Sequence, residues 1–352
     1  MLIIVTTSWN SGGAERFAYQ LALYASSVCE VVVISKRGKE SDHLYSQFVD
    51  LLGEDNIIGL SSFESLLKVL KILVKHNSVV FNVRGTFALD FNMLARLLGS
   101  RTFSCYRESE YQYQKNGLKI LITSIMERLL LLSNQVYTNS PILPSKFLQR
   151  SFHQGRINKI DNYIRENAHS WKKERNDKLI NICHIGRPSI AKDYRTILES
   201  VRVVNSLSNE SVKLHLIGPG VQEYLKELDD TTCKDMSIEF YGYVQDPDSV
   251  LLNCDVFLFP SINEGQPNSL LEALSMGIPC IASNIEAIKE AIPGAFAETL
   301  INAEDTEKFA KAIMELFIEG TGYDTKEVSM YVKERYSIEN TIGKLMISLG
   351  LC

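Results

Sequence analysis

The chain has 352 residues, of which 45% are hydrophobic and 22% charged, so it carries enough apolar material for two domains and lacks the composition of a disordered protein. Its seven cysteines are dispersed without a CxxC motif or a His/Cys ligand spacing, which argues against structural zinc and a disulfide framework and favours a reducing compartment. The net charge of −5 joins a basic first half, with 18 Lys and Arg against 13 Asp and Glu in residues 1–164, to an acidic second half.

Short β-branched runs alternate with segments of helical length through the first half of the chain. Residues 1–6 lack the basic segment of a signal peptide and predict a strand. No uncharged apolar run approaches the ~18 residues of a membrane span, so we expect a cytoplasmic protein. The predicted strands are 2–6, 31–34, 79–82, 102–106 and 135–138, and the predicted helices are 15–26, 63–75, 87–98 and 118–132. This alternation is typical of a doubly wound α/β domain.

A polar, highly charged stretch at 165–178 has no apolar face and is predicted to be a linker between two domains. A second alternation follows it and predicts a second α/β domain over 179–336. Its predicted strands are 179–185, 213–217, 238–241, 256–260 and 279–282, and its predicted helices are 194–205, 221–227, 269–275 and 303–317. One more helix is predicted at 337–349.

The strongest motif is EGQPNSLLE, which runs from Glu264 to Glu272. An apolar strand ends in a tight loop that holds Glu264, Pro267 stands where the first turn of a helix tolerates proline, and Glu272 lies one turn deeper. Amides at a helix N-terminus bind anions, whereas the two carboxylates suit hydroxyl groups on either side of a diphosphate. The motif therefore predicts a sugar–diphosphate–nucleoside ligand; the alternative is a loop glutamate and a solvated helix face without function.

This segment resembles the E-x7-E motif of retaining GT-B glycosyltransferases, in particular glycosyltransferase family 4. The resemblance implies the α/β GT-B fold, two doubly wound Rossmann-like domains that face a cleft. Residues 1–164 would bind the acceptor, 179–336 the nucleotide sugar, and 337–352 would cross back to the first domain. It also implies that Glu264 reaches hydroxyls of the donor sugar and that Glu272 binds the ribose. Donor contacts through amides are expected from Gln266, Asn268, Ser269 and Leu270.

A second segment that resembles this family lies at the start of the second domain. Gly186 stands at a strand end and precedes Arg187 and Lys192. The resemblance assigns the arginine and the lysine to the donor diphosphate, where an arginine fork and a lysine point charge neutralise the charge that develops as the glycosidic bond breaks. Without this context, the same two residues would be interpreted as surface charges.

Three further loops match at strand ends. Gly218 follows one strand of the second domain, and Tyr243 and Val244 follow the next, in a loop that commonly contacts the nucleobase in the family. Gly12 and Gly13 follow the first strand of the chain and fit the family's glycine-rich first loop, where glycines let the backbone approach a phosphate or sugar closely.

Two further patterns suggest a metal site or a catalytic histidine, but their context favours a structural role. Asp246-Pro-Asp248 is a D-x-D string, which binds a divalent metal in another class of glycosyltransferase. Its place between the base-contacting loop and a helix favours a turn and an N-cap, so no metal is expected. The six histidines have no ligand or triad spacing, and His184 and His215 are expected to pack within strands.

The acceptor side departs from the family pattern. Many members carry a histidine at the end of the fourth strand of the first domain, near the sugar acceptor. This chain instead has Arg107 and Glu108 there. Arg107 suits an anionic acceptor and Glu108 suits acceptance of a hydroxyl proton, and an ion pair that holds the loop is the alternative.

Together these features predict a retaining hexosyltransferase (EC 2.4) without metal or other cofactor. It would move a hexose-type sugar from a UDP- or GDP-sugar to a hydroxyl of a glycan or lipid-linked acceptor, as in surface polysaccharide biosynthesis. The basic first domain suits an anionic membrane surface or a phosphorylated acceptor, or is simply solvated. Nucleic acid is not expected, because the basic residues are not interleaved with aromatics. A catalytically silent GT-B subunit that binds a sugar nucleotide or a partner enzyme, and a GT-B sugar-nucleotide epimerase, remain open.

Overall fold

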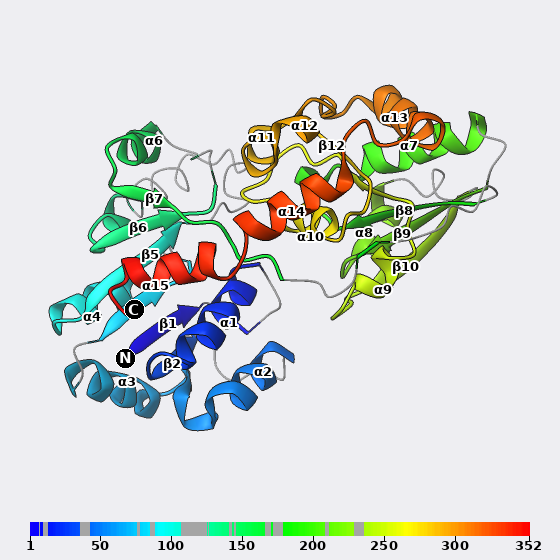
Figure 1. Ribbon diagram of the computed structural model, residues 1–352. Coiled ribbons are helices and arrows are strands. Elements are labelled where there is room, and N and C mark those ends of the chain that lie inside the picture. Colours follow the sequence, from blue (N-terminus) through cyan, green and yellow to red (C-terminus); the bar gives the residue numbers. More distant parts are fainter. Residues whose placement is uncertain are drawn as a thin grey trace. The chain divides into compact units, whose positions relative to one another are not determined.

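The computed structural model describes residues 1–6, 8–9, 13–35, 43–75, 78–84, 89–106, 125, 127–140, 143, 146–165, 170–171, 179–207, 211–228 and 236–352. They form two compact units (Figure 1). Unit 1 comprises residues 1–163 and 338–352, and unit 2 comprises residues 164–337. Each unit contains one parallel sheet with helices, so the predicted α/β fold with two sheets is confirmed.

Unit 1 is built on a seven-stranded parallel sheet in the order β3-β2-β1-β4-β5-β6-β7. Helices cover both faces, which is why β1, β2 and β4 are buried along their whole length and mostly apolar. Leu2 and Ile4 of β1 face a core that includes α1, whereas Ile3 and Val5 face a core that includes α3 and α4. Successive residues of one strand thus supply both cores. The strands are β1 (Leu2–Thr6), β2 (Val31–Ser35), β3 (Ile57–Gly59), β4 (Val79–Asn82), β5 (Arg101–Tyr106), β6 (Gln135–Thr138) and β7 (Ile157–Lys159).

Several elements of unit 1 are absent from the sequence-based expectation. Strands β3 and β7 have three residues each, which is too short for a periodic pattern. The helices are α1 (Gly13–Ser26), α2 (His43–Leu52), α3 (Phe63–Lys75), α4 (Leu89–Leu97) and α6 (Lys146–His153), with a 3₁₀ turn η1 (Glu54–Asn56). Of these, α2 and α6 were not expected. Most of the predicted helix at 118–132 lies outside the described residues.

Unit 2 has a five-stranded parallel sheet in the order β10-β9-β8-β11-β12. All five predicted strands are present, with bounds that move by one or two residues. They are β8 (Leu179–Ile185), β9 (Ser211–Ile217), β10 (Ser237–Gly242), β11 (Val256–Phe259) and β12 (Cys280–Ala282). The two faces of this sheet again bury separate cores, one with α7 and α13 and the other with α10 and α14.

The helices of unit 2 include α11, α12 and α14, which the sequence pattern did not indicate, and α9, which was expected after the D-x-D string but without bounds. Three of these have four to six residues, less than two full turns, so they leave no clear amphipathic signal. The helices are α7 (Tyr194–Leu207), α8 (Val221–Leu228), α9 (Asp248–Leu251), α10 (Asn268–Ser275), α11 (Glu286–Ala291), α12 (Gly294–Ala297), α13 (Thr306–Glu319) and α14 (Thr325–Arg335), with a 3₁₀ turn η4 (Ile190–Lys192).

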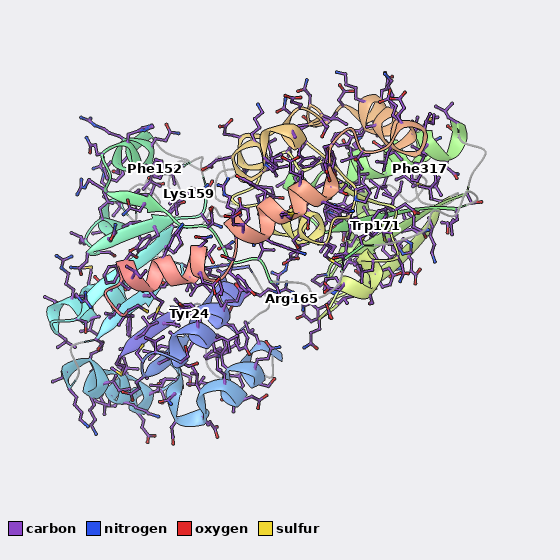
Figure 2. All side chains as sticks on the ribbon, in the orientation of Figure 1. Tyr24, Phe152, Lys159, Arg165, Trp171 and Phe317 are labelled. Atoms are coloured by element: carbon purple, nitrogen blue, oxygen red, sulfur yellow. The ribbon has the colours of Figure 1, made fainter. Side chains whose placement is uncertain are left out.

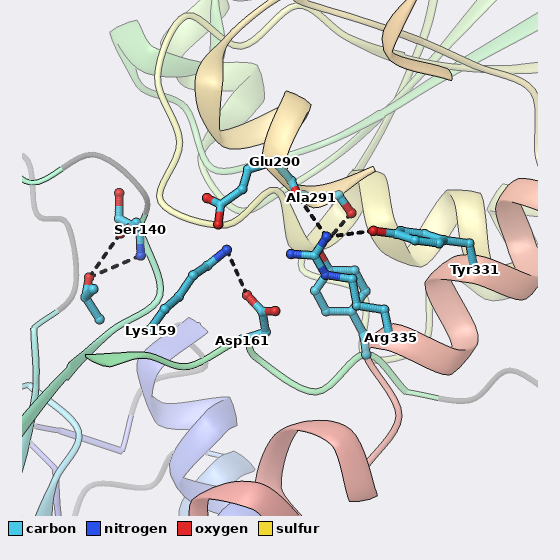
Figure 3. Close-up of polar contacts among 9 residues, drawn as sticks. Ser140, Lys159, Asp161, Glu290, Ala291, Tyr331 and Arg335 are labelled. Atoms are coloured by element: carbon cyan, nitrogen blue, oxygen red, sulfur yellow. Dashed lines mark hydrogen bonds and ion pairs between the residues drawn. The ribbon is translucent and has the colours of Figure 1, made fainter. Parts of the chain in front are cut away.

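The end of α14 is fixed against the end of α11 (Figure 3). Nη1 of Arg335 donates to the carbonyl oxygen of Glu290 at 2.7 Å, and the Tyr336 hydroxyl donates to the carbonyl of Ala291 at 2.8 Å. Carbonyls in the last turn of a helix lack intrahelical partners, and positive charge there is favourable. Arg335 and Tyr336 therefore cap α11 and hold α14 against it.

The last residues of the chain pack within unit 1. A π-helical turn η5 (Glu339–Gly343) leads into α15 (Lys344–Ser348), where a single α-helix was predicted. Four apolar side chains of this segment are buried in the core that contains α1: Ile342, Leu345, Met346 and Leu349. The hydroxyls of Ser348 and Tyr137 on β6 lie 2.8 Å apart.

Arg165 and Trp171 of the predicted linker belong to unit 2, and both are labelled in Figure 2. Ile164, the residue before the predicted linker, is the first residue of unit 2; it is buried, and its N–H donates to the carbonyl of Tyr336 at 3.1 Å. Trp171 donates from its backbone N–H to Met276 at 2.8 Å and from its indole N–H to Cys254 at 2.9 Å. The charged residues 166–169 and 172–178 lie outside the described part of the chain. Among the described residues, no helix has the length and apolar character needed to cross a membrane.

Candidate functional site

The strand order of unit 2 places a topological switch point between β8 and β11. Strands β9 and β10 extend the sheet beyond β8, and β12 extends it beyond β11. In open α/β sheets, ligands bind outside the carboxyl ends of the strands at such a point. The segments that follow β8 and β11 carry Arg187, Lys192 and Glu264. The topology and the sequence motifs therefore indicate the same residues as a candidate ligand site.

Lys192 and Glu264 meet in an ion pair, with Nζ 2.6 Å from Oε1. Their loops are joined by a hydrogen bond from the N–H of Ile262 to the carbonyl of Ala191 at 2.9 Å. The two charged side chains are only 19% and 13% exposed, and Nζ of Lys192 also lies 4.8 Å from the ring centroid of Phe259. Two residues 72 positions apart in the sequence thus form one partly buried ion pair.

The N-terminus of α10 lies directly after the loop that holds Glu264. The backbone N–H groups of Ser269 and Leu270 donate to no residue in the described ranges. The Ser269 hydroxyl donates at 3.1 Å to the carbonyl of Ile185, the last residue of β8. Unsatisfied amides at a helix start attract anions, so this end of α10 offers an oxyanion site beside β8.

Other predicted donor-binding residues surround this helix start. Gln266 is buried, and its carbonyl accepts the N–H of Asn268 at 2.9 Å. Glu272 is half-buried on α10, one turn beyond the amides. Arg187 follows Gly186, is exposed, and makes no ion pair or hydrogen bond with any residue that the structure describes. Of the two cations predicted for the diphosphate, Lys192 is therefore engaged by a carboxylate whereas Arg187 is available.

Two glycines bring the ends of β8 and β9 into contact. A Cβ on Gly218 would stand 2.0 Å from the carbonyl oxygen of Gly186, and a Cβ on Gly186 would stand 2.9 Å from Nε2 of His184. The N–H of Gly218 donates to the carbonyl of Gly242, at the end of β10, at 2.8 Å. Both positions exclude a side chain because backbone or ring atoms already fill the space.

The loop after β10 has an exposed and a buried part. Tyr243 is 46% exposed, whereas Val244 is partly buried against the core of unit 2. Asp246 and Asp248 follow, and Nη2 of Arg165 pairs with both, at 2.9 Å from Oδ1 of Asp246 and 2.8 Å from Oδ2 of Asp248. The D-x-D string is thus held by an arginine.

The D-x-D string adopts the predicted turn, since Asp246 Oδ1 accepts the N–H of Asp248 at 3.4 Å. The predicted N-cap is wrong: Pro247 precedes α9, no side chain caps this helix, and Asp248 is its first residue. Arg165 occupies the carboxylates instead. Among the described residues, no group of three His, Cys, Asp or Glu side chains is placed to hold a metal ion.

His184 and His215 pack in the sheet, as predicted. Nδ1 of His184 lies 2.9 Å from the carbonyl of Leu258, which can only accept, so Nδ1 carries the proton. Its Nε2 is buried without a hydrogen-bond partner in the described part of the chain. Burial, followed by the nearby charge of Lys192, lowers the pKa of His184 to about 3. A neutral imidazole ring therefore lies near Lys192. The sequence shows only a histidine within a strand and does not indicate that it lies near the lysine.

Of the residues predicted for unit 1, the structure describes one. Gly13 is the exposed first residue of α1. Gly12, Arg107 and Glu108 lie outside the described residues.

Sequence reasoning missed a charged pair at the switch point of unit 1, between β1 and β4. Nε of Arg84 lies 3.6 Å from Oε1 of Glu15. Glu15 is buried in the first turn of α1, and Arg84, two residues beyond β4, is 39% exposed. The only indication of this pair in the sequence is that each residue follows a predicted strand.

Known proteins resemble this chain over the region that carries these residues. The family described as Glycosyl transferases group 1 matches residues 180–319. Over 306 residues the chain is 25% identical to the capsular polysaccharide biosynthesis glycosyltransferase CapH of Staphylococcus aureus, and the match spans 80% of each chain. It is 33% identical over 116 residues to the UDP-Gal:alpha-D-GlcNAc-diphosphoundecaprenol alpha-1,3-galactosyltransferase of Escherichia coli, but this match spans 32% of the chain and only 29% of that protein.

The fold has close counterparts among solved structures. HepE from Anabaena, in complex with UDP and glucose, superposes with a TM-score of 0.76 at 15% identity, over 100% of this chain and 99% of that one. The lipopolysaccharide outer core galactosyltransferase WaaB superposes with a TM-score of 0.72 at 15% identity, over 98% and 97% of the two chains. The chain is a glycosyltransferase with the GT-B fold, and its residues 180–319 match the group 1 glycosyl transferases. In this glycosyltransferase, Lys192 and Glu264 both lie in the matched region.

Gly218→Ala should destabilise unit 2 of the glycosyltransferase by about 2 kcal/mol, because the new Cβ overlaps the backbone of Gly186 and forces both loops to shift. Gly294→Ala is the matched control, since nothing lies within 4 Å of its Cβ and the residue is helical. Urea unfolding followed by circular dichroism measures both. Equal midpoints for the two variants would refute the close approach.

The glycosyltransferase should lose stability on acidification through His184. Its pKa is about 3 when folded against an ordinary 6.5, so only the unfolded chain takes up this proton between those values, and stability falls as pH falls. From about pH 7 to about pH 5 the loss amounts to about 2 kcal/mol. His184→Phe should flatten the pH dependence of the unfolding free energy. Identical slopes for wild type and His184→Phe would contradict this.

Proposed function

We propose that this glycosyltransferase moves a hexose-type sugar from a UDP- or GDP-sugar, with retention of configuration, to a hydroxyl of a glycan or lipid-linked acceptor. The observation that carries the proposal is the Lys192–Glu264 pair beside the unsatisfied amides of α10. A cation, an anion-binding helix start and a hydroxyl-binding carboxylate are the groups that a sugar diphosphate requires. The sugar nucleotides found with HepE, which shares the fold, support this choice of donor.

In the mechanism that we favour, the donor diphosphate lies against the N–H groups of Ser269 and Leu270, with Arg187 and Lys192 on its oxygens. When Lys192 turns to the diphosphate, the carboxylate of Glu264 is free to accept a hydrogen bond from a hydroxyl of the donor sugar. The bond between the sugar and the diphosphate breaks as the acceptor oxygen attacks on the same face, and the acceptor proton passes to the leaving diphosphate oxygen. The two cations stabilise the charge on the leaving group, and no metal is required in this scheme. Glu272 binds the ribose.

The acceptor that we propose is an intermediate of surface polysaccharide synthesis. CapH is named for capsular polysaccharide biosynthesis, and the relative from Escherichia coli is named for a sugar carried on diphosphoundecaprenol. The excess of Lys and Arg in residues 1–164 suits a phosphorylated acceptor at an anionic membrane surface. On this basis we place the enzyme on the cytoplasmic face of the membrane, in peripheral contact through unit 1.

Lys192→Ala, Arg187→Ala and Glu264→Gln should each lower kcat by roughly 10² to 10³, because each loses a group that acts on the breaking bond. Slow hydrolysis of UDP- and GDP-sugars measures this without a known acceptor. Glu272→Ala should chiefly weaken binding of UDP or GDP in calorimetry. Lys308→Ala is the matched control, because its ion pair with Asp305 lies on the surface of the same unit. Full activity of Lys192→Ala or Arg187→Ala would overturn the assignment.

Retention is tested on the product itself. Once a donor and acceptor pair is found, proton NMR of the new glycosidic bond should show the anomeric configuration of the donor. A product of opposite configuration would refute same-face attack while leaving the donor site in place.

A further inference from the structure

The loop between β10 and α9 is fixed at both ends. At its start, the carbonyl of Gly242 accepts the N–H of Gly218 at 2.8 Å. At its end, Asp246 and Asp248 are held by Arg165. Tyr243 and Val244 lie between these two anchors, so the conformation of the proposed nucleobase loop depends on both.

The second anchor is ionic and rests on a single nitrogen. Nη2 of Arg165 contacts Asp246 at 2.9 Å and Asp248 at 2.8 Å, and the hydrogen bond from Arg165 lowers the pKa of Asp246. Asp248 is only 13% exposed, and its burial raises its pKa. Two carboxylates two residues apart repel each other unless a cation stands between them. Without Arg165 the turn would therefore be strained by like charge.

Arg165 is itself fixed, because it follows a buried residue. Ile164 is buried in the core of unit 2, and its N–H bonds to the carbonyl of Tyr336. The guanidinium of Arg165 is also within electrostatic range of Glu272 on α10. One cation thus acts on the loop of Tyr243 and on the carboxylate proposed to bind the ribose.

We propose that Arg165 is a positioning residue for the nucleoside end of the donor, through its bridge to Asp246 and Asp248. This rests on the proposed function, since it assumes a nucleoside diphosphate in unit 2. A five-residue loop with an exposed tyrosine has to be ordered when a base binds, and a loop that is already ordered binds more tightly. The ion pairs of Arg165 are with the base loop, and those of Lys192 and Glu264 are with each other, so Arg165 should govern nucleotide affinity and leave the chemical step unchanged.

Arg165→Ala should weaken binding of UDP or GDP, whichever the wild type binds, by about tenfold in calorimetry, and should raise KM for the sugar nucleotide similarly while kcat stays within about twofold. Arg165→Lys should recover most of the affinity, because one nitrogen makes both contacts. Asp246→Ala, at a 62% exposed carboxylate, removes part of the bridge with less risk to folding and should share part of the loss.

Arg195→Ala is the matched control, since Arg195 forms an exposed 2.8 Å pair with Glu199 in the same unit. It should leave both Kd and KM unchanged. An unchanged Kd in Arg165→Ala, or a lower kcat at unchanged KM, would overturn the positioning role. If the wild type binds neither UDP nor GDP, the proposed function fails together with this inference. If it binds one of them but Arg165→Ala binds equally well, only this inference fails.

Discussion

The proposed donor site depends on one partly buried ion pair, Lys192–Glu264. A charge shielded from water is stable only beside its counter-charge, and removal of one partner leaves the other uncompensated. The surroundings meet this condition in several ways: Gly186 leaves room for the lysine stem, the face of Phe259 lies near the ammonium, and His184 stays neutral below it. A second cation at position 184 would repel Lys192 at short range, which is why the burial of that ring matters for the site.

The pair also fixes its two side chains relative to each other. In the proposed scheme, Glu264 holds Lys192 until the diphosphate of the donor competes for it. The amides of Ser269 and Leu270 belong to a rigid helix, and their position is set by the bond from Ser269 to the end of β8. Electrostatic groups held in place before the ligand arrives need little reorganisation during the reaction. In the proposed scheme, the sheet thereby supplies a site whose charges are already oriented.

Much of this arrangement could be predicted from residues alone. Parallel strands of five to seven residues carry continuous apolar runs, so β1, β2, β5, β8 and β9 were found nearly at their bounds. Glu264 and the start of α10 were singled out because a loop, a proline and a helix leave a compact signature, whereas Lys192 was singled out through the resemblance to glycosyltransferase family 4. The three-residue strands β3 and β7 and the one-turn helix α12 left no such signature. The bridge from Arg165 to Asp248 could not be predicted either, since it joins residues 83 positions apart through side chains in segments without periodicity.

The C-terminal segment makes the first domain discontinuous in sequence, because residues 338–352 complete a core that begins with residue 2. The apolar surface of α1 and β1 that Ile342, Leu345, Met346 and Leu349 cover stays open while unit 2 is being synthesised. During translation, unit 2 can therefore mature before the domain that emerged first. A chain that ends between residues 337 and 341 would keep every proposed donor-binding residue of unit 2 and would leave the core of unit 1 without these four side chains.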